Sequence, residues 1–324
     1  MRRALLLYNP ESGRRRDRRL ADVQAAAAAL QSSGIEVVIE PTSGPGSAAG
    51  QVREVMARGC DSVIVCGGDG SVHEVLPAVV GTPVALGVVP LGTGNGLAHD
   101  LRLPPNPARA ARLLATADIC PIPLARVEYA RPDGGREQRY FIAAAGAGAD
   151  AQMVYRLGLA FKRRWGMAAY YAESTRQWLR HSFPLFTAEF RYRDAPWRRE
   201  QVSEVLAVRI THFGGLLDQL APGAELTRPD FQLVLFKTRS RFSFLRYMMG
   251  VWTRRPYASS YIENLRATEC RCLPLETGNR EPETHIYAEA DGELLSTLPV
   301  SFYMSNETVN LLVPRTAPRK SAVL

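Results

Sequence analysis

The chain has 324 residues, 46% of them apolar and 22% charged, which is the composition of an ordinary globular protein long enough for two domains. It has no run of about 18 apolar residues, and the N-terminal run Ala4–Leu7 is too short for a signal peptide, so we expect a cytoplasmic protein without a membrane-spanning helix. Five scattered cysteines argue against a disulfide framework, and a net charge of +8 suits an acidic partner such as a nucleotide, a nucleic acid or an anionic membrane.

The first part of the chain alternates strand-like and helix-like segments. The predicted strands are residues 2–10, 35–40, 61–66 and 84–90, and the predicted helices between them are residues 17–33, 47–58 and 71–80. This alternation predicts an α/β domain with a mostly parallel sheet flanked by helices, which we assign to residues 1–122. Ligands of such sheets bind beyond the carboxyl ends of the strands.

After residue 122 the pattern changes to short strand-like runs separated by turn residues. The runs cover residues 124–130, 139–146, 186–192, 204–211, 231–237, 267–273, 286–295 and 300–305, and helical patterns interrupt them at 161–181 and 242–254. We therefore predict a mainly-β, sandwich-like domain over residues 123–313, whose last segment could return to pack on the first domain. The basic residues 314–324 are predicted to form a flexible tail.

Glycine-rich turns follow three of the predicted strands. Gly67-Gly68-Asp69-Gly70 is the most unusual, because a carboxylate in such a turn would repel a phosphate unless Mg²⁺ lay between them, usually through water. The turn at 90–96 and the turn at 9–13 have the same polar, glycine-containing character. Taken alone, the first turn could equally be a plain tight turn, but three such turns at one sheet edge favour a nucleotide triphosphate site.

The motifs that carry these turns resemble those of a known family. NPESG from Asn9, CGGDGSVHEV from Cys66, PLGTGN from Pro90 and ADGELL from Ala290 are, in this order and spacing, similar to the diacylglycerol kinase catalytic family, which includes bacterial diacylglycerol, sphingosine and ceramide kinases. The resemblance implies a nucleotide-binding domain followed by a lipid-binding domain, with the active site in the cleft between them. It implies an ATP-dependent lipid kinase that uses Mg²⁺ and converts diacylglycerol to phosphatidic acid or phosphorylates a related lipid.

The resemblance also assigns roles to individual residues. Asp69 matches the aspartate held near Mg²⁺, through water, and the phosphates, and Glu293 matches the acidic residue that accepts the proton of the lipid hydroxyl. Asp150 matches a residue that contacts the polar head of the lipid, although a helix N-cap would explain it almost as well. Asp291-Gly292 is by itself a strong hairpin signal. The residues matched to the ATP site are Asn9, Pro10, Glu11, Ser12, Gly13, Thr42, Gly67, Gly68, Asp69, Gly70, Ser71, Val72, His73, Glu74, Thr93 and Asn95.

Three departures from the family pattern bear on these roles. Asn95-Gly96 replaces the usual Asn-Asp, so Asp100, one helical turn on, either compensates or is an ordinary solvated residue. His73 stands where the family usually has asparagine. The segment Leu226–Asp230 lacks the paired carboxylates with which some bacterial members hold a structural magnesium, and it contains Arg228, so we predict no metal there.

The remaining signals concern partners. Residues 161–180 and 239–257 mix arginines with bulky apolar residues, so each is either an amphipathic helix on an anionic membrane or a core helix with solvated arginines. We expect a lipid substrate, transient and peripheral contact with an anionic membrane surface, and no nucleic acid, since no helix-turn-helix or zinc pattern is present; a homodimer is left open. Two alternatives are an NAD kinase-like enzyme, which the late Asp-Gly-Glu disfavours, and a catalytically silent lipid- or nucleotide-binding protein, which the retained Asp69 and Glu293 disfavour.

Overall fold

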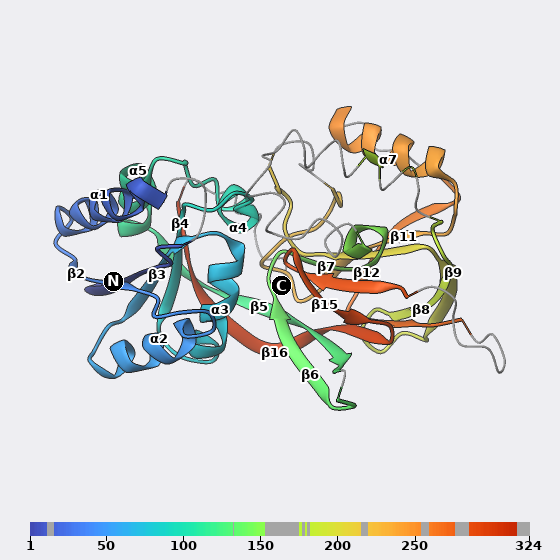
Figure 1. The fold of residues 1–324 in the computed structure, drawn as a ribbon, viewed down its shortest axis with the longest axis horizontal. Coiled ribbons are helices and arrows are strands. Elements are labelled where there is room, and N and C mark those ends of the chain that lie inside the picture. The colour runs from blue at the N-terminus through green and yellow to red at the C-terminus, as the bar shows by residue number, and fades with distance from the viewer. Residues whose placement is uncertain are drawn as a thin grey trace. The chain divides into compact units, whose positions relative to one another are not determined.

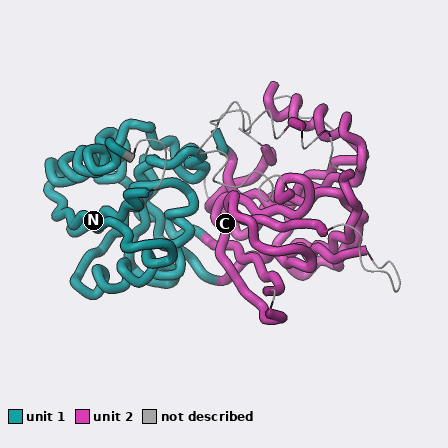
Figure 2. Tube along the Cα trace, in the orientation of Figure 1, with its two compact units in different colours: residues 1–122, 212–214, 307–324 teal, residues 123–211, 215–306 magenta. Residues whose placement is uncertain are grey.

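The chain forms two compact units (Figure 2). The computed structural model describes residues 1–11, 16–131, 133–152, 175–176, 179, 182–214, 220–253, 259–275 and 285–315. The first unit contains residues 1–122, 212–214 and 307–324, and the second contains residues 123–211 and 215–306. Ser12, Gly13, most of the helix predicted at 161–181 and the tail 316–324 lie outside the described residues.

The first unit is built on a parallel sheet with the strand order β2-β1-β3-β4-β16. Its strands β3 and β4 are buried along their whole length, which explains why they are continuous apolar runs in the sequence. The bounds are β1 Arg3–Tyr8, β2 Glu36–Pro41, β3 Ser62–Gly67, β4 Ala85–Pro90 and, for the whole of the strand that ends in this unit, β16 Val300–Val313.

Helices cover both faces of this sheet. Helix α1 packs against α5 and α2 packs against α3, and Figure 1 shows the two pairs on opposite faces. Helix α5 was not predicted, although Asn106 caps its first turn by accepting the Arg109 N–H and Pro107 occupies its first position, both common start signals. The bounds are α1 Arg19–Gln31, preceded by the short 3₁₀ turn Arg16–Arg18, α2 Ala48–Ala57, α3 Asp69–Val79, α4 Gly96–Asp100 and α5 Pro107–Ala115.

The second unit is a β-sandwich. One layer is an antiparallel sheet with the order β12-β11-β10-β7-β14-β15, and the other contains β16-β13-β8-β9 and the hairpin β5-β6. The bounds are β5 Asp118–Ala130, β6 Arg136–Phe141, β7 Ala144–Gly148, β8 Phe186–Arg191, β9 Arg198–Val202, β10 Glu204–Val208, β11 Phe231–Phe236, β12 Ile262–Ala267, β13 Glu269–Leu273, β14 Tyr287–Ala290 and β15 Glu293–Thr297.

A single apolar core lies between the two layers of the sandwich. Phe141 from the hairpin contacts both layers, since its ring centroid lies 6.5 Å from that of Phe231 and 6.3 Å from that of Phe302. Cys270 and Cys272 are buried in the same core, as expected for small apolar strand residues. Helix α7, Arg241–Thr253, packs on this unit.

The predicted fold class is confirmed: an α/β unit with a parallel sheet is followed by a mainly-β unit. The helix predicted at 242–254 is confirmed as α7, whereas the single run predicted at 286–295 is two strands joined by a turn. Within the described residues, no helix has the length and apolar character needed to cross a membrane. The location of an active site in a cleft between domains stays a prediction.

Candidate active site

Asp69 joins the two central glycine turns of the first unit. It is the first residue of α3, and its Oδ2 accepts the backbone N–H of Gly96 at 2.9 Å while its Oδ1 accepts that of Leu97 at 3.2 Å. The carboxylate therefore caps the first turn of α4, where helical N–H groups have no partner within the helix. Each carboxylate oxygen can accept a second hydrogen bond, so Asp69 still fits the role of receiving a metal-bound water.

The glycines of these turns allow two backbone segments to touch. A Cβ built on Gly92 would lie 2.5 Å from the Gly68 Cα, a distance that no side chain tolerates. Gly68 itself is extended and directly precedes α3, a helix of 11 residues. The open N-terminal turn of such a helix is a favourable place for a phosphate group, because its N–H groups and its dipole both favour an anion. The turns therefore fit a nucleotide phosphate.

Asn95 shapes the second turn with its side chain. Its backbone is left-handed, with φ 59°, and its Oδ1 accepts the Gly92 N–H at 3.0 Å while its Nδ2 donates to the Gly92 carbonyl at 3.0 Å. A contact between the Asn95 side chain and a nucleotide stays a prediction. Thr93 is an exposed residue of the same turn.

The first turn lies beside the end of β2. Asn9 follows β1, and its Oδ1 accepts the Glu11 N–H at 2.8 Å, which closes a local turn. Thr42 follows the neighbouring parallel strand, and its N–H donates to the Tyr8 carbonyl at 2.8 Å. The carboxyl ends of the parallel strands β1 and β2 thus bring Asn9 and Thr42 to the same edge of the sheet. Of the other matched residues, Pro10 lies in this turn, and Gly70, Ser71, Val72, His73 and Glu74 lie in α3 with His73 buried.

Arg19 was missed by the sequence analysis. Its side chain is buried, and its Nη1 donates to the Leu91 carbonyl at 2.9 Å, so it supports the second turn from α1. Burial lowers the pKa of this guanidinium. A signal was present, because Arg19 precedes the buried Val23, Ala26 and Leu30 at the spacing of one helical face.

Asp100 makes a contact that the sequence did not predict, while a compensating role at the ligand site stays a prediction. Its Oδ1 accepts the backbone N–H of His212 at 3.0 Å, and so it binds a segment, residues 212–214, that belongs to the first unit despite its place in the sequence. Gly214 in this segment has φ 76° and lies against the His99 ring, where a Cβ would clash at 2.7 Å. The carboxylate of Asp100 thus organises structure at the end of α4.

In the second unit, Asp291 and Gly292 form the turn between β14 and β15. Both residues have positive φ, 50° and 80°, which is the geometry of a tight hairpin turn and confirms the hairpin interpretation. The Asp291 carboxylate accepts three backbone N–H groups, from Ile142 at 2.9 Å, Ala143 at 2.9 Å and Ala144 at 3.1 Å. These bonds attach the hairpin to the connection between β6 and β7, and so they fix where the next residue, Glu293, begins β15.

Glu293 pairs with an arginine that the sequence analysis did not single out. Its Oε2 lies 2.8 Å from Nη2 of Arg139 in β6, and the two side chains are 34% and 27% exposed. The carboxylate is therefore held in one orientation while it remains accessible to a substrate. No local signal predicts this pair, because the two residues are far apart in the sequence.

Asp150 is half-buried and lies beside two buried carboxyl groups, those of Glu204 and Glu289. The Glu204 side chain is buried and accepts the backbone N–H groups of Ala149 and Asp150, and it is hydrogen-bonded to the Asp150 side chain. Burial raises the pKa of Glu204 well above its ordinary value, and the neighbouring Asp150 raises it further. Burial likewise raises the pKa of Asp150 and of Glu289. Carboxyl groups that keep a proton can donate as well as accept, which suits recognition of a hydroxyl group.

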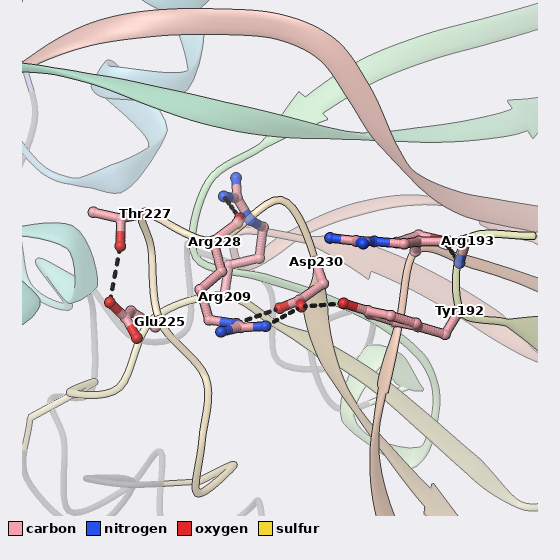
Figure 3. Close-up of polar contacts among 8 residues, drawn as sticks. Tyr192, Arg193, Arg209, Glu225, Thr227, Arg228 and Asp230 are labelled. Atoms are coloured by element: carbon pink, nitrogen blue, oxygen red, sulfur yellow. Dashed lines mark hydrogen bonds and ion pairs between the residues drawn. The ribbon is translucent and has the colours of Figure 1, made fainter. Parts of the chain in front are cut away.

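Arg228 lies in the loop of residues 226–230, for which we predict no metal, and Arg209 from outside the loop contacts its backbone. In Figure 3, Arg228 clamps Asp230, with Nε to Oδ1 at 2.9 Å and Nη2 to Oδ2 at 2.6 Å, and Tyr192 approaches the same carboxylate. Arg209 is fully buried and donates to the Leu226 carbonyl at 2.8 Å, and burial lowers its pKa to about 10. Among the described residues no group of three or more His, Cys, Asp or Glu side chains could hold a metal ion. That this loop binds no metal stays a prediction.

Comparison with known proteins gives consistent results. Residues 3–127 match the family described as diacylglycerol kinase catalytic domain. The chain is 29% identical over 250 residues to a diacylglycerol kinase of Bacillus subtilis (strain 168), covering 76% of this chain and 77% of that one. It is 27% identical over 320 residues to a diacylglycerol kinase of Mycobacterium tuberculosis (strain ATCC 25618 / H37Rv), covering 95% and 94% of the two chains.

Solved structures share the fold. The chain resembles the crystal structure of a diacylglycerol kinase from Bacillus anthracis str. Sterne with a TM-score of 0.68 and 18% sequence identity, over 98% of both chains. At this identity the similarity concerns the fold alone.

Proposed function

We propose that this chain, whose residues 3–127 belong to the diacylglycerol kinase catalytic domain family and which is accordingly a phosphotransferase, transfers the γ-phosphoryl group of ATP to the hydroxyl of diacylglycerol or a closely related lipid. The observation that carries the proposal is the pair of glycine turns held together by the Asp69 carboxylate at the N-terminus of α3. Transient contact with an anionic membrane surface belongs to the same proposal, because diacylglycerol is insoluble in water. A cytoplasmic location and a homodimer stay predictions.

In this proposal the first unit binds the nucleotide. The N–H groups at the start of α3 would receive the phosphates, and the hydroxyls of Thr42, Ser71 and Thr93 would contact phosphate or sugar oxygens. Phosphoryl transfer needs little covalent chemistry from the protein, so holding the phosphates in place and stabilising their charge accounts for most of the catalysis.

Asp69 would hold Mg²⁺ through water. A bound Mg²⁺ would neutralise negative charge on the phosphates as the phosphoryl group is transferred. The two N–H bonds from α4 orient the Asp69 carboxylate before any ligand arrives, so it need not be reorganised during the reaction.

Glu293 would act as the general base. It would accept the proton of the lipid hydroxyl at Oε1 or Oε2 as the oxygen attacks phosphorus, and ADP would leave with the electrons of the broken bond. Arg139 would orient this carboxylate through its contact with Oε2. Asp150 and Glu204 would bind a polar group of the lipid head in the second unit.

The direct test is phosphate transfer from labelled ATP to a panel of acceptors. Diacylglycerol, sphingosine, ceramide and phosphatidylglycerol in mixed micelles, and NAD in solution, would be incubated with the purified chain and Mg²⁺. We expect label in a lipid, with diacylglycerol the best acceptor. Transfer to NAD and to no lipid, or nucleotide binding without any transfer, would contradict the proposal.

A further inference from the structure

Helix α7 of the second unit carries large apolar side chains on two opposite faces. Phe244, Tyr247 and Val251 are buried and lie on one face. The Phe244 ring stacks on Phe236 with centroids 4.3 Å apart and lies 4.5 Å from the ring of Phe183. These ring contacts attach α7 to the second unit, and Figure 1 shows the place of the helix there. The fold of the second unit therefore accounts for this face completely.

The other face of α7 is exposed. At 100° per residue, Phe242, Leu245, Met249 and Trp252 lie within an arc of about 80°, opposite the buried face. Their exposed fractions are 80%, 48%, 44% and 59%. In the described part of the chain, four of the eleven exposed large apolar residues lie on this one helix. Folded proteins rarely leave such a continuous apolar stripe without a partner.

The charges around the stripe indicate which partner it fits. Arg241 and Arg246 are exposed and, by the same helical geometry, flank the stripe on its two sides at about 20° and 40° beyond its edges. Helix α7 contains no aspartate or glutamate, and the exposed Arg239 lies two residues before its first residue. An apolar stripe edged by arginines matches an anionic lipid surface in both respects. A two-fold contact with a second copy would instead bring arginines of the same helix toward each other.

We propose that the exposed face of α7, formed by Phe242, Leu245, Met249 and Trp252, docks on the surface of an anionic lipid bilayer. The inference rests on the proposed function, since an enzyme that phosphorylates a water-insoluble lipid has to meet its substrate in a membrane. The four apolar side chains enter the boundary between headgroups and acyl chains, and Arg241 and Arg246 remain at the level of the lipid phosphates. Trp252 suits this position because indole prefers the membrane interface.

The test is sedimentation of the full chain with vesicles, without nucleotide. Vesicles of phosphatidylcholine and phosphatidylglycerol at a ratio of 7:3 would be compared with vesicles of phosphatidylcholine alone. We expect stronger binding to the anionic vesicles, and weaker binding at high salt because salt screens the arginines. In the double variant Phe242→Ser/Trp252→Ser we expect a partition coefficient at least about tenfold lower, because burial of one large apolar side chain contributes about that factor.

Matched variants test whether vesicle binding depends on the stripe of α7 or on any exposed apolar side chain. Leu245 on α7 and Leu20 on α1 are leucines on helices with nearly equal exposed fractions, 48% and 49%. Leu245→Ser should weaken vesicle binding and Leu20→Ser should not. Arg246→Gln should lower binding to the anionic vesicles, whereas Arg112→Gln, at an exposed position on α5, should not. Equal vesicle binding by the wild type and the double variant would overturn the proposal, and so would loss of a dimer in the double variant with vesicle binding unchanged.

A second measurement separates this inference from the proposed function. The variants would be assayed with a short-chain diacylglycerol dispersed in detergent, where docking on a bilayer is not needed. We expect their rates there to equal that of the wild type, and their rates on vesicles containing long-chain diacylglycerol to fall with their binding. If α7 controls vesicle binding while no lipid is phosphorylated, the proposed function fails and the docking surface stands. Rates that fall equally in both assays would overturn the docking surface.

Discussion

Each unit contains an Asp-Gly pair whose carboxylate accepts backbone N–H groups of a distant segment, and these two pairs fold differently. Asp69-Gly70 follows a buried parallel strand and begins helix α3, whereas Asp291-Gly292 has left-handed backbone at both residues and turns one antiparallel strand into the next. Yet both carboxylates accept backbone N–H groups from a distant segment, two for Asp69 and three for Asp291. In both pairs the aspartate therefore holds a distant backbone segment by hydrogen bonds, while the surrounding strands determine the backbone conformation of the pair itself.

The two units also differ in which carboxylate is proposed to take part in the reaction. In the first unit Asp69, which holds the distant backbone segment, is itself the residue proposed to act on the ligand. In the second unit the roles are divided, since Asp291 holds the hairpin and Glu293, two residues on, carries the proposed function. Substitution of Asp69 should therefore change activity and stability together, whereas in the second unit substitution of Glu293 should change activity and substitution of Asp291 should change stability.

The largest effect is expected at Glu293. Glu293→Gln removes the proposed base and should lower kcat by about 10²–10⁴-fold while the free energy of unfolding changes little. The control is Glu269→Gln, because Glu269 pairs with Arg191 at 2.6 Å and the pair has similar exposure, 31% for each side chain. Lipid phosphorylation and urea unfolding would be measured for both. Equal kcat values in the two variants would remove Glu293 from the mechanism.

Asp69→Ala should lower both activity and stability. We expect phosphorylation to fall below detection and the free energy of unfolding to fall by about 1–3 kcal/mol, because two N–H groups of α4 lose their acceptor. Asp61→Ala is the matched variant, since Asp61 also accepts two backbone N–H groups in the first unit, those of Arg2 and Arg3. It should lose some stability and keep its activity, and loss of activity in both would show that unfolding alone explains the result.

Asp291→Ala should act mainly on stability. Three N–H groups lose their acceptor, and alanine tolerates φ near 50° less well than aspartate does, so we expect the free energy of unfolding to fall by at least about 2 kcal/mol. Asp133→Ala, in the exposed hairpin turn between β5 and β6 where one N–H is accepted, should cost much less. Urea unfolding measures both. If Asp291→Ala lowered the free energy of unfolding no more than Asp133→Ala, the three hydrogen bonds of Asp291 would not be important for stability.

The smallest effect, and the one with a pH dependence, concerns Glu204. Because burial raises its pKa above the ordinary value, the folded state holds this proton more tightly than the unfolded state. The stability that Glu204 contributes is therefore complete below its unfolded pKa, and it is lost as the pH rises through the folded pKa. Glu204→Gln, which resembles the protonated form, should gain stability relative to the wild type as the pH rises above the unfolded pKa of the glutamate.

Glu263 provides a control of opposite sign. Burial alone would raise its pKa, but the hydrogen bonds from Lys237 and Arg198 outweigh this effect and lower it. Its contribution is present above the unfolded pKa and is lost as the pH falls through the folded pKa. Glu263→Gln should therefore be less stable than the wild type at neutral pH, with the difference vanishing in acid. Thermal unfolding across the pH range would show the two trends. If the stability difference between Glu204→Gln and the wild type did not change with pH, Glu204 would not keep its proton in the folded state.

Local sequence was sufficient for the order and type of most elements. Alternating strand and helix patterns predicted the parallel sheet of the first unit, and short strand runs predicted the sandwich, because periodicity and turn residues act over a few neighbouring positions. The resemblance to the diacylglycerol kinase family is confirmed by the family match over residues 3–127 and by relatives that align with most of the chain. The rule that ligands bind beyond the carboxyl ends of parallel strands also pointed to the edge at which Asn9 and Thr42 lie.

Tertiary structure alone decided what the important side chains contact. The bonds from Asp69 to Gly96 and Leu97, and the pairing of Glu293 with Arg139, join residues separated by 27, 28 and 154 positions. No local pattern encodes such contacts, because they depend on how strands pair and helices pack. For the same reason, α7 could be recognised in the sequence as a helix with apolar and basic residues, but which of its two apolar faces is buried became clear only from its packing against Phe236.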